Sequence, residues 1–236
     1  VQEEARGIPD AFLITQDWLQ DDDVCLILGD NIFFGESFGH KLSSAISELN
    51  GATIFTQQVN NPQRFGVACF DEHDNITSLH EKPKEFISNH AITGLYLFDN
   101  QVAKFAANTR PSGRGELEIM DVLEQYRQQQ RLSHTTLGRG FAWLDAGTAE
   151  SLLEAGSCIH TIEKMQGLKI ACLEELAVRQ GWCDKATILQ HQANQSQSAY
   201  DLYVETSEGE YLDQTGWLYS LKGNTGESAY QLYVDY

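Results

Sequence analysis

The sequence predicts an α/β fold built on a mixed, mostly parallel sheet with helices on its flanks. As far as about Lys185, short apolar runs that end at polar turns alternate with amphipathic stretches, an order typical of such sheets. With 236 residues, 42% of them hydrophobic, the chain can bury a sizeable core.

Each run predicts one element. LILGDNIFFG, from Leu26 to Gly35, indicates a strand buried on both faces that ends at a polar turn, with Phe33 and Phe34 packing the loop that follows. The turn-forming residues Asp71 to Asn75 predict an antiparallel hairpin. In chain order we expect helices over 9–19, 39–49 and 115–129, strands over 24–28, 52–59, 91–99, 132–140 and 141–148, and a helix capped by Thr148.

Composition divides the chain into three predicted segments. Residues 1–147 form the α/β core and residues 148–205 a C-terminal helical region. Residues 206–236 are an atypical tail. From about Lys185 onward Gln, Ser, Asn, Gly and Tyr dominate, and SAYDLYVE at Ser198 is nearly repeated as SAYQLYVDY at Ser228. Two copies are too few for a solenoid, so we interpret them as a local duplication or as an artefact of sequence assembly.

The charge balance excludes some partners. Sixteen basic against thirty-four acidic residues give a net charge of −18, which repels nucleic acids and anionic membranes. Five cysteines without a C-x-x-C pair favour a reducing, cytoplasmic location. No apolar run approaches the length of a membrane span or a signal peptide.

Two aspartates are candidate metal ligands. Asp30 and Asp145 each follow an apolar run, ILG and FAWL, and precede residues that allow a sharp turn. Two carboxylates at one sheet edge suit Mg²⁺, which completes its shell with water and substrate phosphates. The alternative is that each aspartate only caps a turn or helix.

A second group of residues could bind an anion and a polyol. In LHEKPKE, Pro83 predicts an extended Lys82, with the Glu81 and Lys82 side chains on opposite faces. Glutamate accepts hydrogen bonds from hydroxyls and lysine meets phosphate, although a solvated strand would look the same. Arg114 lies in a glycine-flanked loop before a helix, where it could grip an anion or pair with Glu116 or Glu118.

Other chemistries lack their motifs. The sequence contains no Walker-type loop, no G-x-G-x-x-G and no histidine pair at metal-ligand spacing. Gly66 in RFGV marks either a close backbone approach to a ligand or a bulge.

Taken in order, seven motifs resemble the glucose-1-phosphate thymidylyltransferases, bacterial sugar nucleotidyltransferases of deoxysugar synthesis. They cover the chain densely from Val1 to about Trp182: LILGDNIFFG, RFGVACFD, SLHEKPKE, AITGLYLFD, SGRGELEI, LGRGFAWLDAGT and QGLKIACLEELAVRQGW. The resemblance implies a Rossmann-like nucleotidyltransferase fold and magnesium-dependent transfer of a thymidylyl group from dTTP to glucose 1-phosphate. This reaction is the first step of dTDP-rhamnose-type synthesis, and the resemblance implies a cytoplasmic homotetramer.

The resemblance also implies roles for individual residues. Asp30 and Asp145 match the magnesium-binding aspartates, and Lys82 and Arg114 match residues that place the sugar phosphate. The matching substrate-binding residues are Gln2, which reads the base, and Gly7, whose backbone lies near it. They continue with Gly66, Glu81, Lys82, Thr93 and Gly94 around the sugar and its phosphate, and Trp143 beside the second aspartate.

One departure concerns the nucleotide. Members of this family begin with a strand, a glycine-rich loop L-A-G-G-x-G-T-R-L and a catalytic lysine, none of which occurs in these 236 residues. We therefore expect a fragment, or a nucleotide loop supplied by another segment, and impaired transfer by the isolated chain. The alternatives are a non-catalytic sugar-nucleotide-binding or regulatory subunit, and a metal-dependent glycosyltransferase, although no D-x-D follows a buried strand.

Overall fold

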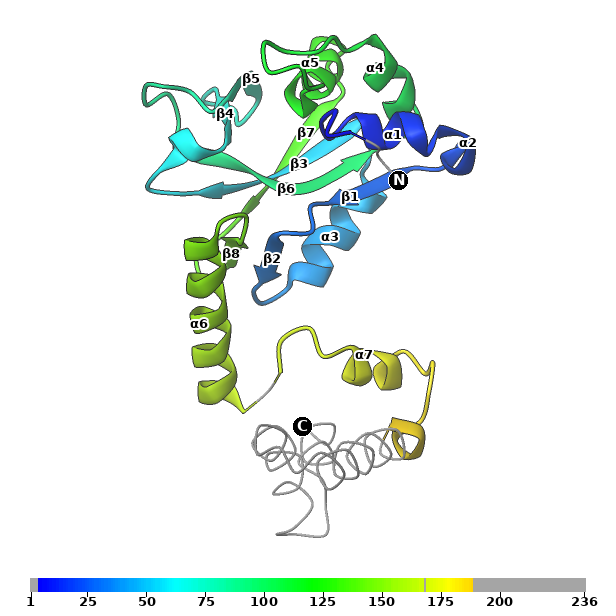
Figure 1. Cartoon of the computed structure of the whole chain (residues 1–236), viewed down its shortest axis with the longest axis vertical. Helices are drawn as coiled ribbons and strands as arrows, with labels where there is room; N and C mark the ends of the chain where they lie inside the picture. The colour runs from blue at the N-terminus through cyan, green and yellow to red at the C-terminus, as the bar shows by residue number, and fades with distance from the viewer. Residues whose placement is uncertain (1–3, 168, 189–236) are drawn as a thin grey trace. The chain divides into compact units, whose positions relative to one another are not determined.

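The computed structural model describes residues 4–167 and 169–188 (Figure 1). The chain divides into two compact units, Val1–Ala155 and Gly156–Tyr236. The predicted boundaries after residues 147 and 205 remain predictions. The tail 206–236 and its duplication lie outside the described residues.

A six-stranded sheet forms the centre of the first unit (Figure 1). Its strands follow the order β5-β4-β6-β3-β7, and β1 pairs with β6. A separate two-stranded sheet joins β2 to β8. The strands are β1 (Val24–Ile27), β2 (Asn31–Phe34), β3 (Ala52–Gln58), β4 (Gly66–Phe70), β5 (Ile76–Glu81), β6 (His90–Phe98), β7 (Leu132–Leu137) and β8 (Ala142–Asp145).

The mixed sheet flanked by helices confirms the predicted fold class, with one difference in pairing. Among the described strands of this sheet, only β3 and β7 pair in parallel. Strands β1 and β3 run in the same direction, as predicted, but β6 lies between them and pairs antiparallel with both. Sequence order could not reveal this inserted strand.

The LILGDNIFFG segment differs from its prediction in one respect and contains an additional strand. The expected burial of β1 on both faces is wrong: burial alternates along the strand and Ile27 is 54% exposed, so one face is less covered within the described chain. The two phenylalanines belong to β2, whose residues pair with β8 from Asn31 opposite Asp145 to Phe34 opposite Ala142. Phe33 also stacks on Phe38 at 5.6 Å between ring centroids.

The helices follow the predicted order, with one helix divided, one added and one starting later. The helix predicted over 9–19 is divided at Thr15. Helix α4 (Val102–Asn108) was not predicted. Helix α5 begins at Ile119 rather than Gly115, because residues 112–118 form a closed loop. The others of the first unit are α1 (Asp10–Ile14), α2 (Gln16–Leu19), α3 (Phe38–Ser47) and the 3₁₀ turn η1 (Pro62–Arg64).

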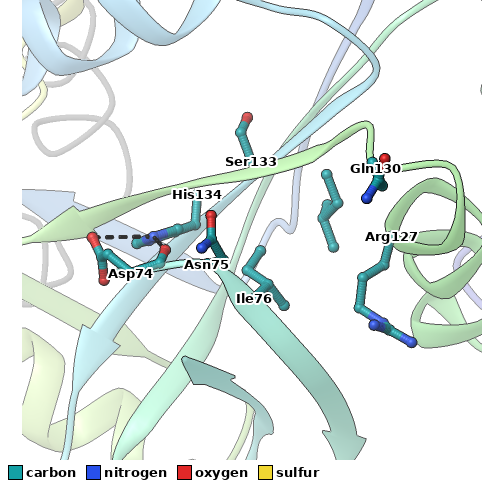
Figure 2. Close-up of a pocket in the computed structure, with 8 residues that line it drawn as sticks. Asp74, Asn75, Ile76, Arg127, Gln130, Ser133 and His134 are labelled. Carbon is teal, nitrogen blue, oxygen red and sulfur yellow. Dashed lines mark hydrogen bonds and ion pairs between the residues drawn. The ribbon is translucent and has the colours of Figure 1, made fainter. Parts of the chain in front are cut away.

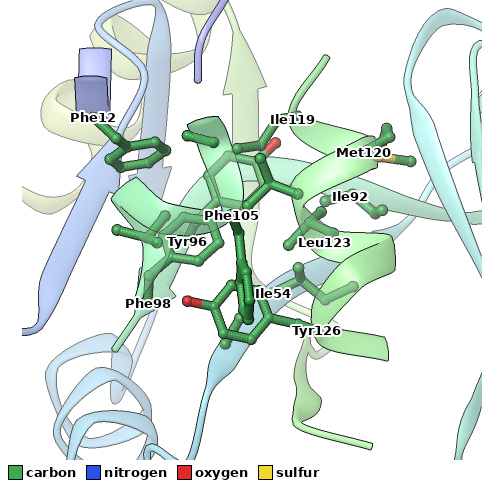
Figure 3. Close-up of a cluster of buried hydrophobic side chains, with 14 of the residues drawn as sticks. Phe12, Ile54, Ile92, Tyr96, Phe98, Phe105, Ile119, Met120, Leu123 and Tyr126 are labelled. Carbon is green, nitrogen blue, oxygen red and sulfur yellow. The ribbon is translucent and has the colours of Figure 1, made fainter. Parts of the chain in front are cut away.

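The core occupies both faces of the central sheet. On one face, aromatic residues from α1, α4, α5 and β6 pack together (Figure 3), for example Phe105 edge-on to Tyr126 at 4.5 Å. On the other face, Phe55 and Leu95 pack with α3. Neighbouring residues Ile54 and Phe55 enter opposite clusters, as strand geometry requires.

The second unit is described through residue 188. Helix α6 (Ala149–Gln166) begins in the first unit, and α7 (Leu173–Arg179) follows it. The cap at Thr148 is confirmed, since its Oγ1 accepts a hydrogen bond from Ser151 N–H at 3.1 Å. None of the described helices is long and apolar enough to cross a membrane.

Candidate functional site

Two predicted aspartates, 115 positions apart in the chain, meet at one glycine. Asp30 lies in the turn between β1 and β2, which the Asn31 N–H closes by donating to Leu28 O at 3.1 Å. Asp145 ends β8, opposite Asn31. A Cβ on Gly147 would lie 3.0 Å from Asp30 Oδ2 and 3.2 Å from Asp145 Oδ1. Both carboxylates therefore face Gly147, which leaves open the space that a side chain would fill.

The donor set at this edge suits a hard divalent cation. Asp30 Oδ1 accepts from Asn31 Nδ2 at 2.7 Å, and Asp145 Oδ1 accepts from Gly147 N–H at 3.2 Å. In the described chain, Oδ2 of each carboxylate accepts no further hydrogen bond, so capping uses only part of their capacity. Residues 4–167 and 169–188 contain no cluster of three or more His, Cys, Asp or Glu suited to a metal. A cation here would therefore complete its shell with water or substrate oxygens, as Mg²⁺ does.

Asn31 connects this edge to two other predicted residues. Its Oδ1 accepts hydrogen bonds from Gly94 N–H at 2.9 Å and from Trp143 Nε1–H at 2.6 Å, while its Nδ2 donates to Asp30. A Cβ on Gly94 would lie 2.6 Å from the Asn31 side chain, so glycine is needed there for a close approach. Sequence reasoning missed Asn31, although an amide in an apolar run must find hydrogen-bond partners and was a usable signal.

Trp143 also contacts the β4–β5 hairpin. Its ring lies 4.8 Å from that of Phe65, centroid to centroid, and Phe65 O accepts from Lys82 N–H at 3.1 Å. Gly66, the next residue, is paired in register with Glu81. A continuous path of contacts therefore joins the carboxylate edge to the charged end of the hairpin.

Three predicted charged residues gather at that hairpin end. Lys82 Nζ lies 3.8 Å and Arg114 Nη2 lies 4.0 Å from the same oxygen, Glu81 Oε1. The prediction of an extended Lys82 with its side chain opposite Glu81 is wrong: its φ is +40° and the two side chains form an ion pair. Strand β5 ends at Glu81, and the positive φ of Lys82 turns the chain there, although its N–H still donates to Phe65 O.

Opposing effects act on the pKa values of the two acids at this end of the hairpin. Burial raises the pKa of Glu81, against the attraction of Lys82 and Arg114. Arg114 forms an ion pair with an acid of the same loop, which was the alternative to anion binding. Its partner is Glu118 rather than Glu116. Burial alone would raise the pKa of Glu118, but hydrogen bonds from Ser112 and Arg114 outweigh it and lower that pKa.

The remaining predicted sugar residues differ in accessibility. A Cβ on Gly66 would lie 3.0 Å from Met120 Cε and 3.4 Å from Glu81 Oε2, so Gly66 exposes backbone beside the acid. Thr93 is fully buried, and its hydroxyl donates to Phe55 O at 2.9 Å inside the sheet. That hydroxyl is used within the fold, whereas the neighbouring Gly94 contacts Asn31.

Of the two residues predicted near the base, only Gly7 lies within the described part of the chain. Gln2 lies outside the described residues. Gly7 adopts φ +95°, and a Cβ there would lie 2.1 Å from Leu117 O. The Arg6 O accepts a hydrogen bond from Leu117 N–H at 2.8 Å. The segment predicted to read the base is thus attached to the loop that carries Arg114.

A separate cavity of about 630 Å³ lies at the other end of the hairpin (Figure 2). The hairpin turn, the end of α5 and the start of β7 line it, and its polar groups include Asp74, Arg127 and His134. Asp74 pairs with His134 at 3.4 Å, and Arg127 pairs with Glu124 at 2.7 Å. None of the predicted site residues lines this cavity.

Comparison with known proteins identifies the family. A family model described as nucleotidyl transferase matches residues 1–161. This chain belongs to the nucleotidyl transferase family. The resemblance seen in the motifs is therefore confirmed, and nucleotidyl transferases are enzymes.

Several relatives of this nucleotidyl transferase carry one name. Proteins named glucose-1-phosphate thymidylyltransferase from Neisseria gonorrhoeae and Mycobacterium tuberculosis (strain CDC 1551 / Oshkosh) are 47% and 40% identical over 204 and 203 residues. Each match covers 86% of this chain, and 71% or 70% of the relative.

Solved structures agree on the fold. A Bacillus anthracis structure, provisionally described as a glucose-1-phosphate thymidylyltransferase in complex with sucrose, is 37% identical with a TM-score of 0.60. That match covers 67% of this chain and 63% of the other, so this nucleotidyl transferase chain spans less than two thirds of that length. A UDP-glucose pyrophosphorylase complexed with UDP-glucose matches with a TM-score of 0.61 at 19% identity, covering 68% of this chain and 64% of the other. This second likeness supports the fold alone.

Proposed function

We propose that this chain contributes the sugar-phosphate site and the cation-binding carboxylates of an enzyme that transfers a thymidylyl group from dTTP to glucose 1-phosphate. The products are dTDP-glucose and pyrophosphate. The observation that carries the proposal is the convergence of Asp30 and Asp145 on Gly147, linked through Asn31, Trp143 and Phe65 to a cluster of Glu81, Lys82 and Arg114. The names of the relatives support the choice of substrates.

The reaction needs positioning and charge neutralisation rather than a covalent enzyme intermediate. An oxygen of the sugar phosphate attacks the α-phosphorus of dTTP, forming a P–O bond. The bond from that phosphorus to the bridging oxygen breaks, and the electron pair leaves with pyrophosphate. Lys82 and Arg114 hold the attacking phosphate, while Glu81 and the Gly66 backbone bind glucose hydroxyls.

Asp30 and Asp145 have a separate role in the proposed reaction. Asp30 and Asp145 would hold Mg²⁺, which when bound supplies positive charge against the reacting phosphates. Asn31 orients Asp30 through the hydrogen bond from its Nδ2. Trp143 forms part of the sugar site, and Gln2 and Gly7 read the base.

The proposal extends to biological context. Its product would enter dTDP-rhamnose-type deoxysugar synthesis in the cytoplasm. The assembly would be a homotetramer with subunit contacts from the helical region 148–182. We propose further that the 236-residue chain alone transfers slowly, because its sequence contains no glycine-rich phosphate loop.

Isothermal titration calorimetry tests this assignment. Glucose 1-phosphate, and dTTP with Mg²⁺, are titrated into the 236-residue chain and into the same chain preceded by a strand and a glycine-rich loop of the L-A-G-G-x-G-T-R-L type. We expect both proteins to bind glucose 1-phosphate and only the extended protein to bind dTTP tightly. Failure of both to bind glucose 1-phosphate would overturn the site, and tight dTTP binding by the short chain would overturn the role of the added loop.

A further inference from the structure

The loop that carries Arg114 is closed by its own hydrogen bonds. Ser112 N–H donates to Glu116 O at 2.8 Å, and Gly115 N–H donates back to Ser112 O at 2.8 Å. Arg114 N–H donates to Ser112 Oγ at 3.3 Å. The backbone therefore holds Arg114 at a defined place before α5.

Glu118 then fixes the direction of the Arg114 side chain. Arg114 Nη2 donates to Glu118 Oε1 at 2.8 Å and to Oε2 at 2.9 Å, and its Nε donates to Oε1 at 3.3 Å. Ser112 Oγ donates to the same Oε1 at 2.7 Å. Arg114 is 53% exposed but Glu118 only 18%, so the carboxylate is the better fixed partner.

The start of α5 anchors Glu118 in turn. Glu118 is the residue immediately before the helix, in extended conformation. The first two helical residues, Ile119 and Met120, are buried in the core at 7% and 8% exposure. The carboxylate therefore directly precedes two residues that are buried in the core.

This arrangement leaves one edge of Arg114 for a ligand. Its Nη1 donates no hydrogen bond within the described chain, while Nε and Nη2 are occupied by Glu118. Arg114 Nη2 and Lys82 Nζ both lie within 4.0 Å of Glu81 Oε1. An anion beside Glu81 would therefore meet two cations, one of them already oriented.

We propose that Glu118 is a positioning residue that holds the Arg114 guanidinium so that its Nη1 edge receives the phosphate of the sugar phosphate. The inference rests on the proposed function and adds a residue to it. A free arginine loses rotamer entropy when it grips a ligand, and a pre-oriented one loses less. Glu118 bears a charge of the same sign as the phosphate, but its oxygens are already occupied by Arg114 and Ser112.

The test is a double-mutant cycle on the 236-residue chain. Glucose 1-phosphate binding is measured by calorimetry for the wild type, Glu118→Gln, Arg114→Ala and the double variant, and the melting temperature of each is recorded. We expect Glu118→Gln to weaken glucose 1-phosphate binding about tenfold in the wild-type background. In the Arg114→Ala background the same substitution should weaken binding further by less than about twofold, because the two residues act as a unit. A merely structural role would weaken both backgrounds equally.

Two further variants control the cycle. Glu116→Gln changes the same chemistry in the same loop, and the Glu116 side chain makes no hydrogen bond or ion pair in the part of the chain described, so we expect binding within about twofold of wild type. Ser112→Ala removes one support of Glu118 and should weaken binding in the same direction, less strongly, even if Glu118→Gln does not fold.

The outcomes separate the two proposals. If wild type does not bind glucose 1-phosphate, the proposed function fails and this inference fails with it. If wild type binds and Glu118→Gln binds equally well, or loses the same factor when Arg114 is Ala, only the positioning role is overturned.

Discussion

The two ends of the candidate site are built in different ways. At Gly147, two carboxylates of like charge are brought together by backbone: a turn after β1 and the last residue of β8. At the hairpin end, two acids and two cations hold one another by side-chain contacts. Like charges gathered by backbone can share a cation from outside, whereas in the balanced cluster the acids already pair with the cations.

The largest effect should come from the carboxylate edge. Asp145→Asn removes one of two charges for a cation that supplies several kcal/mol to charge stabilisation, so transfer should fall roughly 100-fold or more. Binding of glucose 1-phosphate should change less than about twofold, because the hairpin end is intact. Mn²⁺ binding by electron paramagnetic resonance and transfer by the extended protein measure these quantities.

Asp21→Asn is the matched control for that variant, since Asp21 is exposed in the loop before β1. It should leave both cation binding and transfer near wild type. Equal losses in the two variants, or no loss in Asp145→Asn, would show that the edge does not bind the cation.

An intermediate effect should follow from the link between Asp30 and the sheet. Gly94→Ala would place a Cβ 2.6 Å from the Asn31 side chain, and overpacking of this kind costs about 1–3 kcal/mol. We expect a lower free energy of unfolding and weaker Mn²⁺ binding, because Asn31 donates to Asp30. Urea unfolding and Mn²⁺ titration provide the measurements.

Gly39→Ala is its control, because a Cβ there meets nothing within 4 Å and Gly39 lies in helix α3. Alanine should stabilise that helix by up to about 1 kcal/mol. If both alanine variants had the same urea midpoint of unfolding as wild type, the close packing of Gly94 against Asn31 would not affect the stability of the fold.

The smallest effect concerns pH at the hairpin end. Since burial raises the pKa of Glu81 in the folded protein, the folded state binds this proton more tightly than the unfolded state. Ionisation therefore costs stability as pH rises from the unfolded pKa through the folded one, and the cost is complete above both. Glu81→Gln should therefore be more stable than wild type at pH 7, and that gain should disappear at about pH 3, below the ordinary pKa range of a glutamate carboxyl.

Urea unfolding at both pH values measures the difference, with Glu85→Gln as the exposed control four residues later. The same Glu81 variant should bind glucose 1-phosphate more weakly, because a charged acceptor is lost. A variant less stable than wild type at pH 7 would mean that the ion pairs with Lys82 and Arg114 outweigh burial.

Local sequence patterns predicted most helices and strands, but not which strands lie next to each other in the sheets. The turn residues Asp71 and Asn75 defined the hairpin, because their hydrogen bonds are local. The pairing of β2 with β8 and the insertion of β6 depend on residues more than thirty positions apart, for which a single sequence contains no distance information. The Lys82 conformation was missed because the local preference before proline favours an extended residue, whereas Lys82 adopts a φ of +40°.

The sequence by itself determined the family, the α/β class and the identity of the charged residues, because motif spacing and hydrophobic periodicity are properties of the chain alone. Only the tertiary structure decided that Asp30 and Asp145 share Gly147, that Asn31 and Trp143 connect them to the hairpin, and that Arg114 points along Glu118. The physical reason is that these contacts join elements distant in sequence, and side-chain orientation there is set by packing and hydrogen bonding rather than by local propensity.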